Sequence, residues 1–193
     1  LSEAAVLDTQ LLRVCGTDTV RVVERIKANL DPNDVAFWVM HDGNSDTLGQ
    51  ILDIKTTGLF TWKPGLIWGK RYCLSHVTGN SRNGAPDWSD PCLSVSKGQP
   101  LVFYARPQVQ AGADRDTCGL VLPLNGQTDV GVGTWIAPQN AALQITPDNK
   151  AVLTDKSGTY RLIWHVNNEG CASDDTITLR FYPVPAITHL QTT

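Results

Sequence analysis

The sequence predicts an all-β protein made of two tandem antiparallel β-sandwich modules, Ig-like or fibronectin-like in architecture. Turn residues recur about every 8–12 residues, which is the spacing of short sandwich strands. No window of about 12 residues repeats its apolar residues with the helical period of about 3.6. The 193 residues are 41% hydrophobic, which suffices for packed cores and fits two domains of about a hundred residues each.

Composition excludes several classes of function. The formal net charge is −3 and the pI is about 5.7, which argues against a nucleic-acid or anionic membrane surface as the partner. No apolar run approaches the ~20 residues that a membrane-spanning helix needs, so we expect no membrane insertion. The five cysteines lie far apart, without a CxxC pair, which favours disulfides and an extracellular, oxidising setting.

We place the first module at residues 1–106. A stretch of weak helical character, residues 1–10, precedes strands that are rich in Val. The turn Asp31-Pro32-Asn33 comes before a largely apolar strand, and residues 79–91 form a long polar surface loop. Strands are expected at residues 11–15, 19–26, 35–41, 50–54, 59–62, 72–78, 92–95 and 101–104.

We place the second module at residues 107–193, because the stretch 106–116 contains a proline and no apolar run and so marks the boundary. Tyr160 directly follows a turn, as in the tyrosine corner of Ig-like domains, where the hydroxyl bonds back to that turn. Trp164 and Trp135 are expected to fill the core. Strands are expected at residues 118–124, 130–136, 143–146, 151–154, 160–166 and 176–182.

The two halves repeat a common frame of landmarks in the same order, which predicts two related modules. Each half opens on Cys-Gly, continues through a Gly and a Tyr that begin a long strand, reaches a second Cys, and closes on Phe-Tyr followed by proline. The matched landmarks are Cys15 with Cys118, Tyr72 with Tyr160, Cys92 with Cys171, and Phe103-Tyr104 with Phe181-Tyr182.

This frame also predicts the disulfides. Cys118 and Cys171 are the only cysteines of the second module, so we expect them to pair in an oxidising compartment. Their bridge would close a loop of about 54 residues and stabilise the module by roughly 4 kcal/mol. The corresponding pair in the first module is Cys15–Cys92. Cys73 is left over in mid-strand and is expected to be a free thiol that packs as a small hydrophobe.

Motifs of catalysis are missing from the sequence, so we expect no enzyme and no cofactor. There is no GxSxG elbow and no glycine-rich phosphate loop followed by a helix and Lys. Asp42, Asn44 and Asp46 alternate as calcium-loop ligands do, and Asp53 stands at the twelfth position of that frame. The expected glycine at position 6 and the final Glu are both missing, so we favour a polar hairpin loop and keep calcium as the alternative.

The polar loop 79–90 is the best candidate for a binding surface, because it carries Trp88. An indole on a polar loop can stack on a sugar or on a neighbouring module. It can equally fold back as a lid over its own core, which is the interpretation that we favour.

The second module, through DTCGLVLPLNG, GVGTW and SGTYRLIWHVNNEGCASDDTITLRFY, resembles the Ig-like (PKD-like) repeats of giant Bacteroidetes cell-surface proteins. The first module, with HDGNSDTLGQIL and DPCLSVSKGQPLVF, resembles a companion repeat of the same proteins. The resemblance implies export by the type IX system and a surface adhesin of the SprB gliding-motility type. It also implies O-glycosylation at Asp-Ser/Thr-apolar sites, here Thr19, Thr47 and Thr176.

The sequence therefore predicts a non-catalytic, disulfide-stapled repeat segment of a long extracellular adhesin or filament. Its expected partners are neighbouring repeat modules, identical chains in a filament, or surface glycans. The alternative is a carbohydrate-binding accessory module of a secreted enzyme that uses Trp88.

Overall fold

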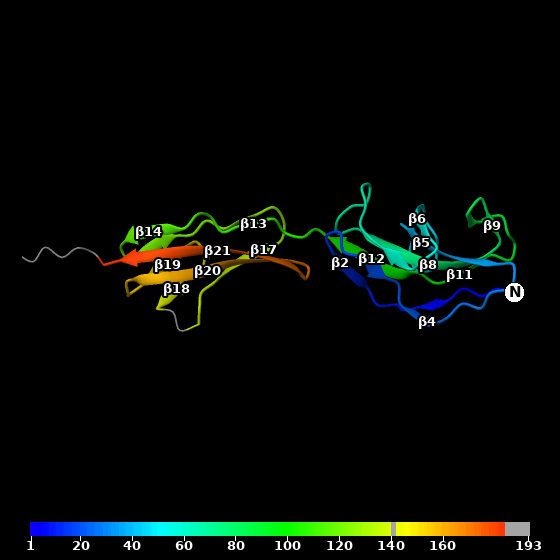
Figure 1. Ribbon diagram of the computed structural model, residues 1–193, viewed down its shortest axis with the longest axis horizontal. Helices are drawn as coiled ribbons and strands as arrows, with labels where there is room; N and C mark the ends of the chain where they lie inside the picture. The colour runs from blue at the N-terminus through cyan, green and yellow to red at the C-terminus, as the bar shows by residue number, and fades with distance from the viewer. Residues whose placement is uncertain (140–141, 184–193) are drawn as a thin grey trace, which may run out of the picture. The chain divides into compact units, whose positions relative to one another are not determined.

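All secondary structure in the described residues, 1–139 and 142–183 of this computed structural model, is β-strand (Figure 1). The chain divides into two compact units, Leu1–Ala105 and Arg106–Thr193. In each unit, two layers of mostly antiparallel strands enclose one apolar core. The predicted all-β fold of tandem Ig-like sandwiches is thus confirmed.

The main sheet of the first unit has the strand order β2-β12-β8-β5-β6, and β11 pairs with the far end of β8. Successive side chains along each strand point to opposite faces of the sheet. Trp38, Met40, Tyr72 and Leu74 face the core, whereas Cys73 lies on the opposite face. The bounds are β2 Leu12–Cys15, β5 Val35–His41, β6 Ile51–Lys55, β8 Arg71–Gly79, β11 Ser94–Val95 and β12 Gln99–Tyr104.

A second, broken layer covers the core face of this sheet. It consists of two strand pairs, β1 with β4 and β3 with β7, which the chain joins through Val22 and Val23. Phe60 of β7 and Val22 are buried against Trp38 and Leu101 of the main sheet. The bounds are β1 Val6–Leu7, β3 Val20–Arg21, β4 Glu24–Ile26 and β7 Leu59–Phe60. A separate hairpin, β9 Ser81–Arg82 with β10 Ala85–Pro86, lies in the long loop after β8.

The second unit has a four-stranded sheet of order β14-β21-β20-β17 and a three-stranded sheet of order β15-β19-β18. Their facing sides bury Leu122, Val152, Leu162 and Leu179 among the core residues. The bounds are β14 Arg115–Cys118, β15 Val121–Pro123, β17 Val132–Ile136, β18 Leu143–Ile145, β19 Ala151–Thr154, β20 Gly158–Asn168 and β21 Cys171–Tyr182, with a small pair β13 Val109–Gln110 and β16 Gln127–Thr128.

Trp164 is a large, buried side chain of this second core. Its indole lies against Gly126 and Gly133, where an added Cβ would stand only 2.3 Å and 2.1 Å from ring atoms. The indole N–H donates to the carbonyl of Gln127 at 3.1 Å, and Trp135 packs beside the ring at 5.1 Å between centroids. The two glycines are therefore required by packing, because the indole occupies the space of their missing side chains.

The repeated frame of the sequence corresponds to a repeated topology. In each unit the strand that ends in the first cysteine pairs in parallel with the last strand, so that Cys15 lies opposite Tyr104 and Cys118 opposite Tyr182. The last strand in turn pairs antiparallel with the long Tyr-containing strand, β8 or β20. The Tyr160 hydroxyl donates to the carbonyl of Lys156 at 3.3 Å, as expected for a tyrosine corner.

Two local predictions were wrong. Residues 1–10 contain the short strand β1 instead of a helical turn, and the boundary stretch contains β13 and the first half of β14. Arg115 and Asp116 of β14 are exposed, because this strand runs along the sheet edge and is held by backbone pairing to β21. An edge strand needs few apolar side chains, so its sequence resembles that of a linker.

Candidate functional site

The loop that follows β8 is braced by one carboxylate. Asp90 accepts hydrogen bonds at Oδ2 from the backbone N–H and the side-chain amide of Asn80, at 2.9 and 3.0 Å. Its Oδ1 accepts from the backbone N–H of Cys92 at 2.8 Å. These N–H donors, that of Asn80 first, lower the pKa of Asp90. The two ends of the loop are therefore tied together by an ionised side chain.

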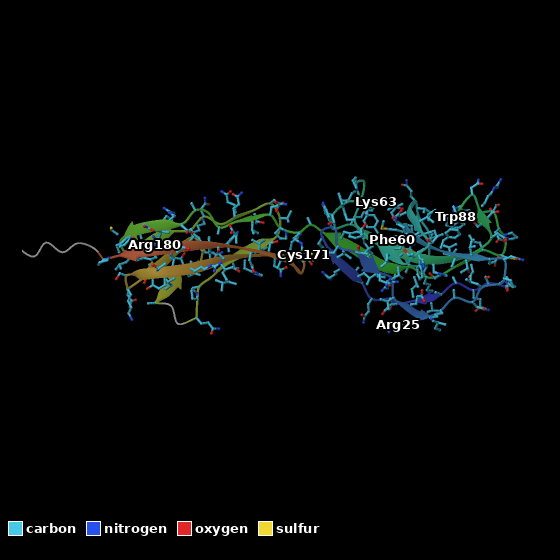
Figure 2. All side chains as sticks on the ribbon, viewed as in Figure 1. Arg25, Phe60, Lys63, Trp88, Cys171 and Arg180 are labelled. Atoms are coloured by element: carbon cyan, nitrogen blue, oxygen red, sulfur yellow. The ribbon has the colours of Figure 1, made fainter. Side chains whose placement is uncertain are left out.

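A tight turn at the end of this loop presents Trp88. The N–H of Asp90 donates to the carbonyl of Asp87 at 3.0 Å, and Asp87 Oδ1 accepts from both the N–H and the hydroxyl of Ser89. The hydroxyl of Ser89 is the main reason that the pKa of Asp87 is lowered. Trp88, between these residues, is 45% exposed (Figure 2). The turn is fixed by its own hydrogen bonds, so its backbone would lose little entropy if Trp88 contacted a partner.

The interpretation of Trp88 as a lid over its own core does not fit this exposure. Nearly half of the side chain remains in contact with solvent, and Trp88 belongs to neither hydrophobic core cluster. The indole offers an apolar face and an N–H donor, a combination that suits a sugar ring or a protein surface.

The four residues predicted as an alternative calcium site have separate partners. Asp42 contacts the N–H of Gln50 and Lys70, while Asn44 Oδ1 accepts from the N–H of Asp46 at 2.8 Å. Asp46 forms an ion pair with Lys97 at 2.9 Å, and that side chain is the main reason that the pKa of Asp46 is lowered. Asp53, on β6, contacts Lys63 at 3.2 Å. Among the described residues no group of three or more His, Cys, Asp or Glu could hold a metal ion, and calcium binding stays a prediction.

The predicted disulfide pairs Cys118–Cys171 and Cys15–Cys92 are wrong. Cys92 and Cys118 are free and exposed, whereas Cys15 and Cys171 are the disulfide-bonded cysteines. Cys73 is free and buried, and burial raises the pKa of its thiol. A buried thiol with a raised pKa reacts slowly, because the thiolate is the nucleophile.

Strand register explains the error. Cys118 lies opposite Tyr182, the last of the twelve residues of β21, whereas Cys171 is the first, so about 36 Å of strand separates them. Cys15 lies opposite Tyr104 at one end of its sheet, whereas Cys92 lies close to β11 at the other end of β8. The Cα atoms of bonded cysteines are within about 7 Å of each other. The matched cysteines stand at opposite ends of the repeated frame, which forbids a bridge within either unit.

The three predicted glycosylation residues differ in accessibility. Thr19 and Thr47 are exposed in loops, whereas Thr176 is partly buried in the middle of β21. The Thr176 hydroxyl accepts a hydrogen bond from Arg161 at 3.3 Å. Thr19 and Thr47 are therefore the more accessible acceptors.

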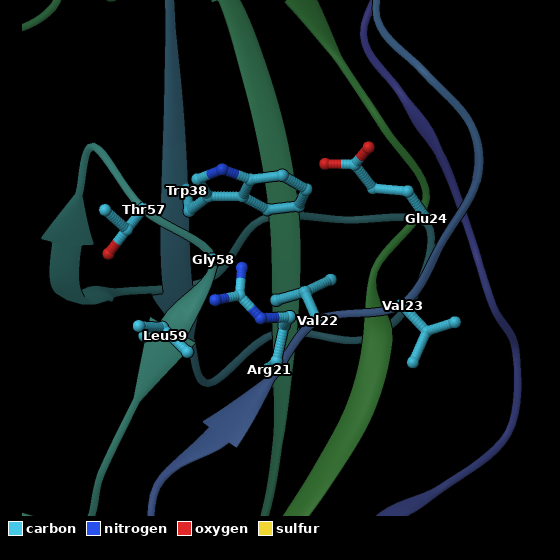
Figure 3. A pocket seen from close by; sticks show the side chains of 8 residues that line it. All are labelled: Arg21, Val22, Val23, Glu24, Trp38, Thr57, Gly58 and Leu59. Carbon is cyan, nitrogen blue, oxygen red and sulfur yellow. The ribbon is translucent and has the colours of Figure 1, made fainter.

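Two further features of the first unit were missed from the sequence. Trp62 and Trp68 stack in parallel, with centroids 4.4 Å apart and an interplanar angle of 4°. An open cavity of about 620 Å³ lies over Trp38 in the broken second layer (Figure 3). The stacked pair was signalled by the six-residue spacing of two tryptophans around Pro64-Gly65, whereas no local pattern indicates the cavity.

No protein-family model matches the chain, and no curated protein matches it. Solved structures similar to the chain include immunoglobulin domains 1–4 of Sidekick-1, with 13% identity, 94% of this chain and 49% of that one covered, and a TM-score of 0.48. The three N-terminal domains of the outer capsid protein Hoc of bacteriophage RB49 have 12% identity, 95% and 71% coverage, and a TM-score of 0.45.

A third solved structure, Drosophila N-cadherin EC1–4, has 10% identity, 95% and 49% coverage, and a TM-score of 0.38. The chain thus spans about half the length of the Sidekick-1 and cadherin structures. Within the described residues, no helix is long and apolar enough to cross a membrane.

Proposed function

We propose that the chain is a non-catalytic structural repeat segment of a long extracellular adhesin or filament. The observation that carries the proposal is the strand frame common to two consecutive units, with the first strand parallel to the last in both. Consecutive units of one frame are typical of repeat arrays, in which length is set by the number of modules. Disulfide-bonded cysteines support an oxidising, extracellular location.

The parallel edge pairing suits a chain that carries tension. In the second unit, β14 enters the ladder at Arg115 and β21 leaves it at Tyr182, which are at opposite ends of that ladder. Tension between the two ends therefore shears all the β14–β21 hydrogen bonds together instead of breaking them one at a time. We propose the same role for β2 and β12, and a mechanical function that needs no cofactor.

Proline in β14 tests this role. Asp116→Pro and Thr117→Pro each remove one backbone N–H, and neighbouring N–H groups point to opposite sides of a strand. One of the two variants should lower the force that unfolds the second unit in single-molecule pulling, whereas Asp116→Ala and Thr117→Ala should leave it unchanged. An unchanged force in both proline variants contradicts a mechanical role of this ladder.

The partners that follow from this proposal are neighbouring modules of the same protein and identical chains in a fibre. We further propose that the segment belongs to a type IX-exported Bacteroidetes gliding adhesin with O-glycans on Thr19 and Thr47. This more specific proposal rests on the sequence resemblance. Intact-mass measurement of protein from its native source tests the glycans, since each modified threonine adds the mass of one glycan.

A carbohydrate-binding accessory module is the second candidate, favoured by the rigid turn that exposes Trp88. Glycan-array binding that is lost in Trp88→Ala would support it, provided that the variant melts at the same temperature. Trp68→Ala is the matched control, since Trp68 is a second partly exposed indole, on another loop.

A further inference from the structure

The broken second layer of the first unit leaves one strand, β4, with a neighbour on one side only. β7 pairs with β3, and the pairing ends where the N–H of Val22 donates to the carbonyl of Gly58 at 2.9 Å. Beyond that point β4 pairs with β1 alone, and the N–H of Asp8 reaches the carbonyl of Val23 from the β1 side. The described strands therefore leave the other side of β4 open.

The cavity over Trp38 occupies this open side. It is lined by residues 21–24 on one chain segment, residues 57–59 on the other, and Trp38. Its volume of about 620 Å³ lies within the range of ligand-binding pockets, about 300–1,000 Å³. Buried Val22 and the Trp38 indole, which is 7% exposed, provide an apolar floor.

Two charged side chains of opposite sign flank the floor. In Figure 3 the Arg21 side chain rises toward Gly58 and the indole, while the Glu24 carboxylate turns toward the ring from another side. Neither side chain makes an ion pair or hydrogen bond with another residue of the described part of the chain. Both are exposed, so their charges are available to an incoming group.

We propose that this cavity binds an extended peptide segment, which adds as a strand beside β4 and carries an acidic, an apolar and a basic residue in succession. The side chains of a strand alternate between its faces, so the apolar residue points inward onto Trp38 and Val22 while its two neighbours point outward. The acidic neighbour then meets Arg21 and the basic neighbour meets Glu24. Main-chain hydrogen bonds to an open strand provide affinity, and the side-chain pockets provide specificity.

A charge swap provides the sharpest test. Capped peptides Thr-Thr-Glu-Val-Lys-Thr-Thr and Thr-Thr-Lys-Val-Glu-Thr-Thr, with a Gln-Val-Gln control, are titrated against the full chain by fluorescence anisotropy. The wild type should prefer one charge order by about tenfold or more, since like charges facing each other are strongly unfavourable. The double variant Arg21→Glu, Glu24→Arg should prefer the opposite order.

A matched control keeps this test interpretable. The swap Asp46→Lys, Lys97→Asp alters an exposed ion pair elsewhere in the unit, and it should leave the order preference of the wild type unchanged. Equal binding of both orders to the wild type, or the same preference in the Arg21/Glu24 swap, overturns the proposal. Self-association of the peptide-free chain that the Arg21/Glu24 swap abolishes also overturns it, since the occupant would then be a second copy.

Backbone methylation separates strand addition from binding through side chains alone. Neighbouring N–H groups of an extended peptide point to opposite edges, so a methyl on the N of Val and a methyl on the N of the next residue block different edges. Strand addition beside β4 predicts that one methylated peptide loses binding and the other retains it. Equal affinity of the two methylated peptides contradicts strand addition.

Discussion

Acidification from pH 7 to pH 5 should destabilise the first unit through His76. The ring is 3% exposed, its Nδ1 accepts the N–H of Ala5 at 3.2 Å, and it packs edge-on against Trp38 with centroids 4.3 Å apart. Burial lowers the pKa of His76 from 6.5 to about 4. Protonation would also place a proton on the nitrogen that accepts from Ala5.

The direction of the stability change follows from the lowered pKa of His76. Below pH 6.5 His76 is protonated in the unfolded chain but remains neutral in the folded chain. The free energy of unfolding therefore decreases as the pH is lowered, until the folded pKa near 4 is reached. The shift corresponds to about 3 kcal/mol in full and to about 2 kcal/mol at pH 5. Burial lowers the pKa of His41 as well, and protonation of that ring acts in the same direction.

Urea unfolding followed by tryptophan emission measures this effect in the full chain. The free energy of unfolding of the wild type should fall between pH 7 and pH 5, and in His76→Asn this fall should be smaller by about 2 kcal/mol. Thr134→Ala, which changes an exposed residue of β17 that carries no ionisable group, should show the same fall as the wild type. An equal fall in wild type and His76→Asn would show that His76 does not take up a proton on unfolding in this pH range.

Three other predictions concern packing and thiols. Gly133→Ala should cost at least about 2 kcal/mol of stability, because its Cβ would stand 2.1 Å from the Trp164 ring; Thr134→Ala, on the exposed face, is the calorimetric control. Gly98→Ala should lower the melting temperature of the first unit, since its Cβ would meet the Cβ of Cys73 at 2.9 Å; an unchanged melting temperature would show that this contact relaxes freely. Mass-mapped alkylation in denaturant, without reductant, should label Cys73, Cys92 and Cys118 and spare Cys15 and Cys171; labelling of either half-cystine would contradict the disulfide assignment.

Several features could be predicted from the sequence because they depend on local chemistry. The turn spacing indicated sandwich strands, and the ordered Cys, Tyr and Phe-Tyr landmarks indicated a repeated unit. Tyr160 bonds back to its turn, as a local motif requires. Trp135 and Trp164 lie directly opposite each other on β17 and β20, inside the core where they were expected.

Other features depend on long-range register, which local patterns do not contain. The cysteine pairs were assigned by order in the chain, although parallel pairing with the last strand sets Cys118 and Cys171 at opposite ends of one unit. The open side of β4 likewise results from the limited length of the β3–β7 pairing, which ends at Gly58 and does not continue along β4. Neither follows from residue types alone.

The direction of pulling tests the proposed mechanical role of the parallel ladder most directly. With one handle at Pro183, a second handle at exposed Ala113 loads the β14–β21 ladder in shear, because the handles stand at its opposite ends. A second handle at exposed Leu120 instead pulls from the end where Cys118 faces Tyr182, and opens the ladder bond by bond. We expect a clearly higher unfolding force for the Ala113 geometry; equal forces in the two geometries would contradict a mechanical role of the β14–β21 ladder.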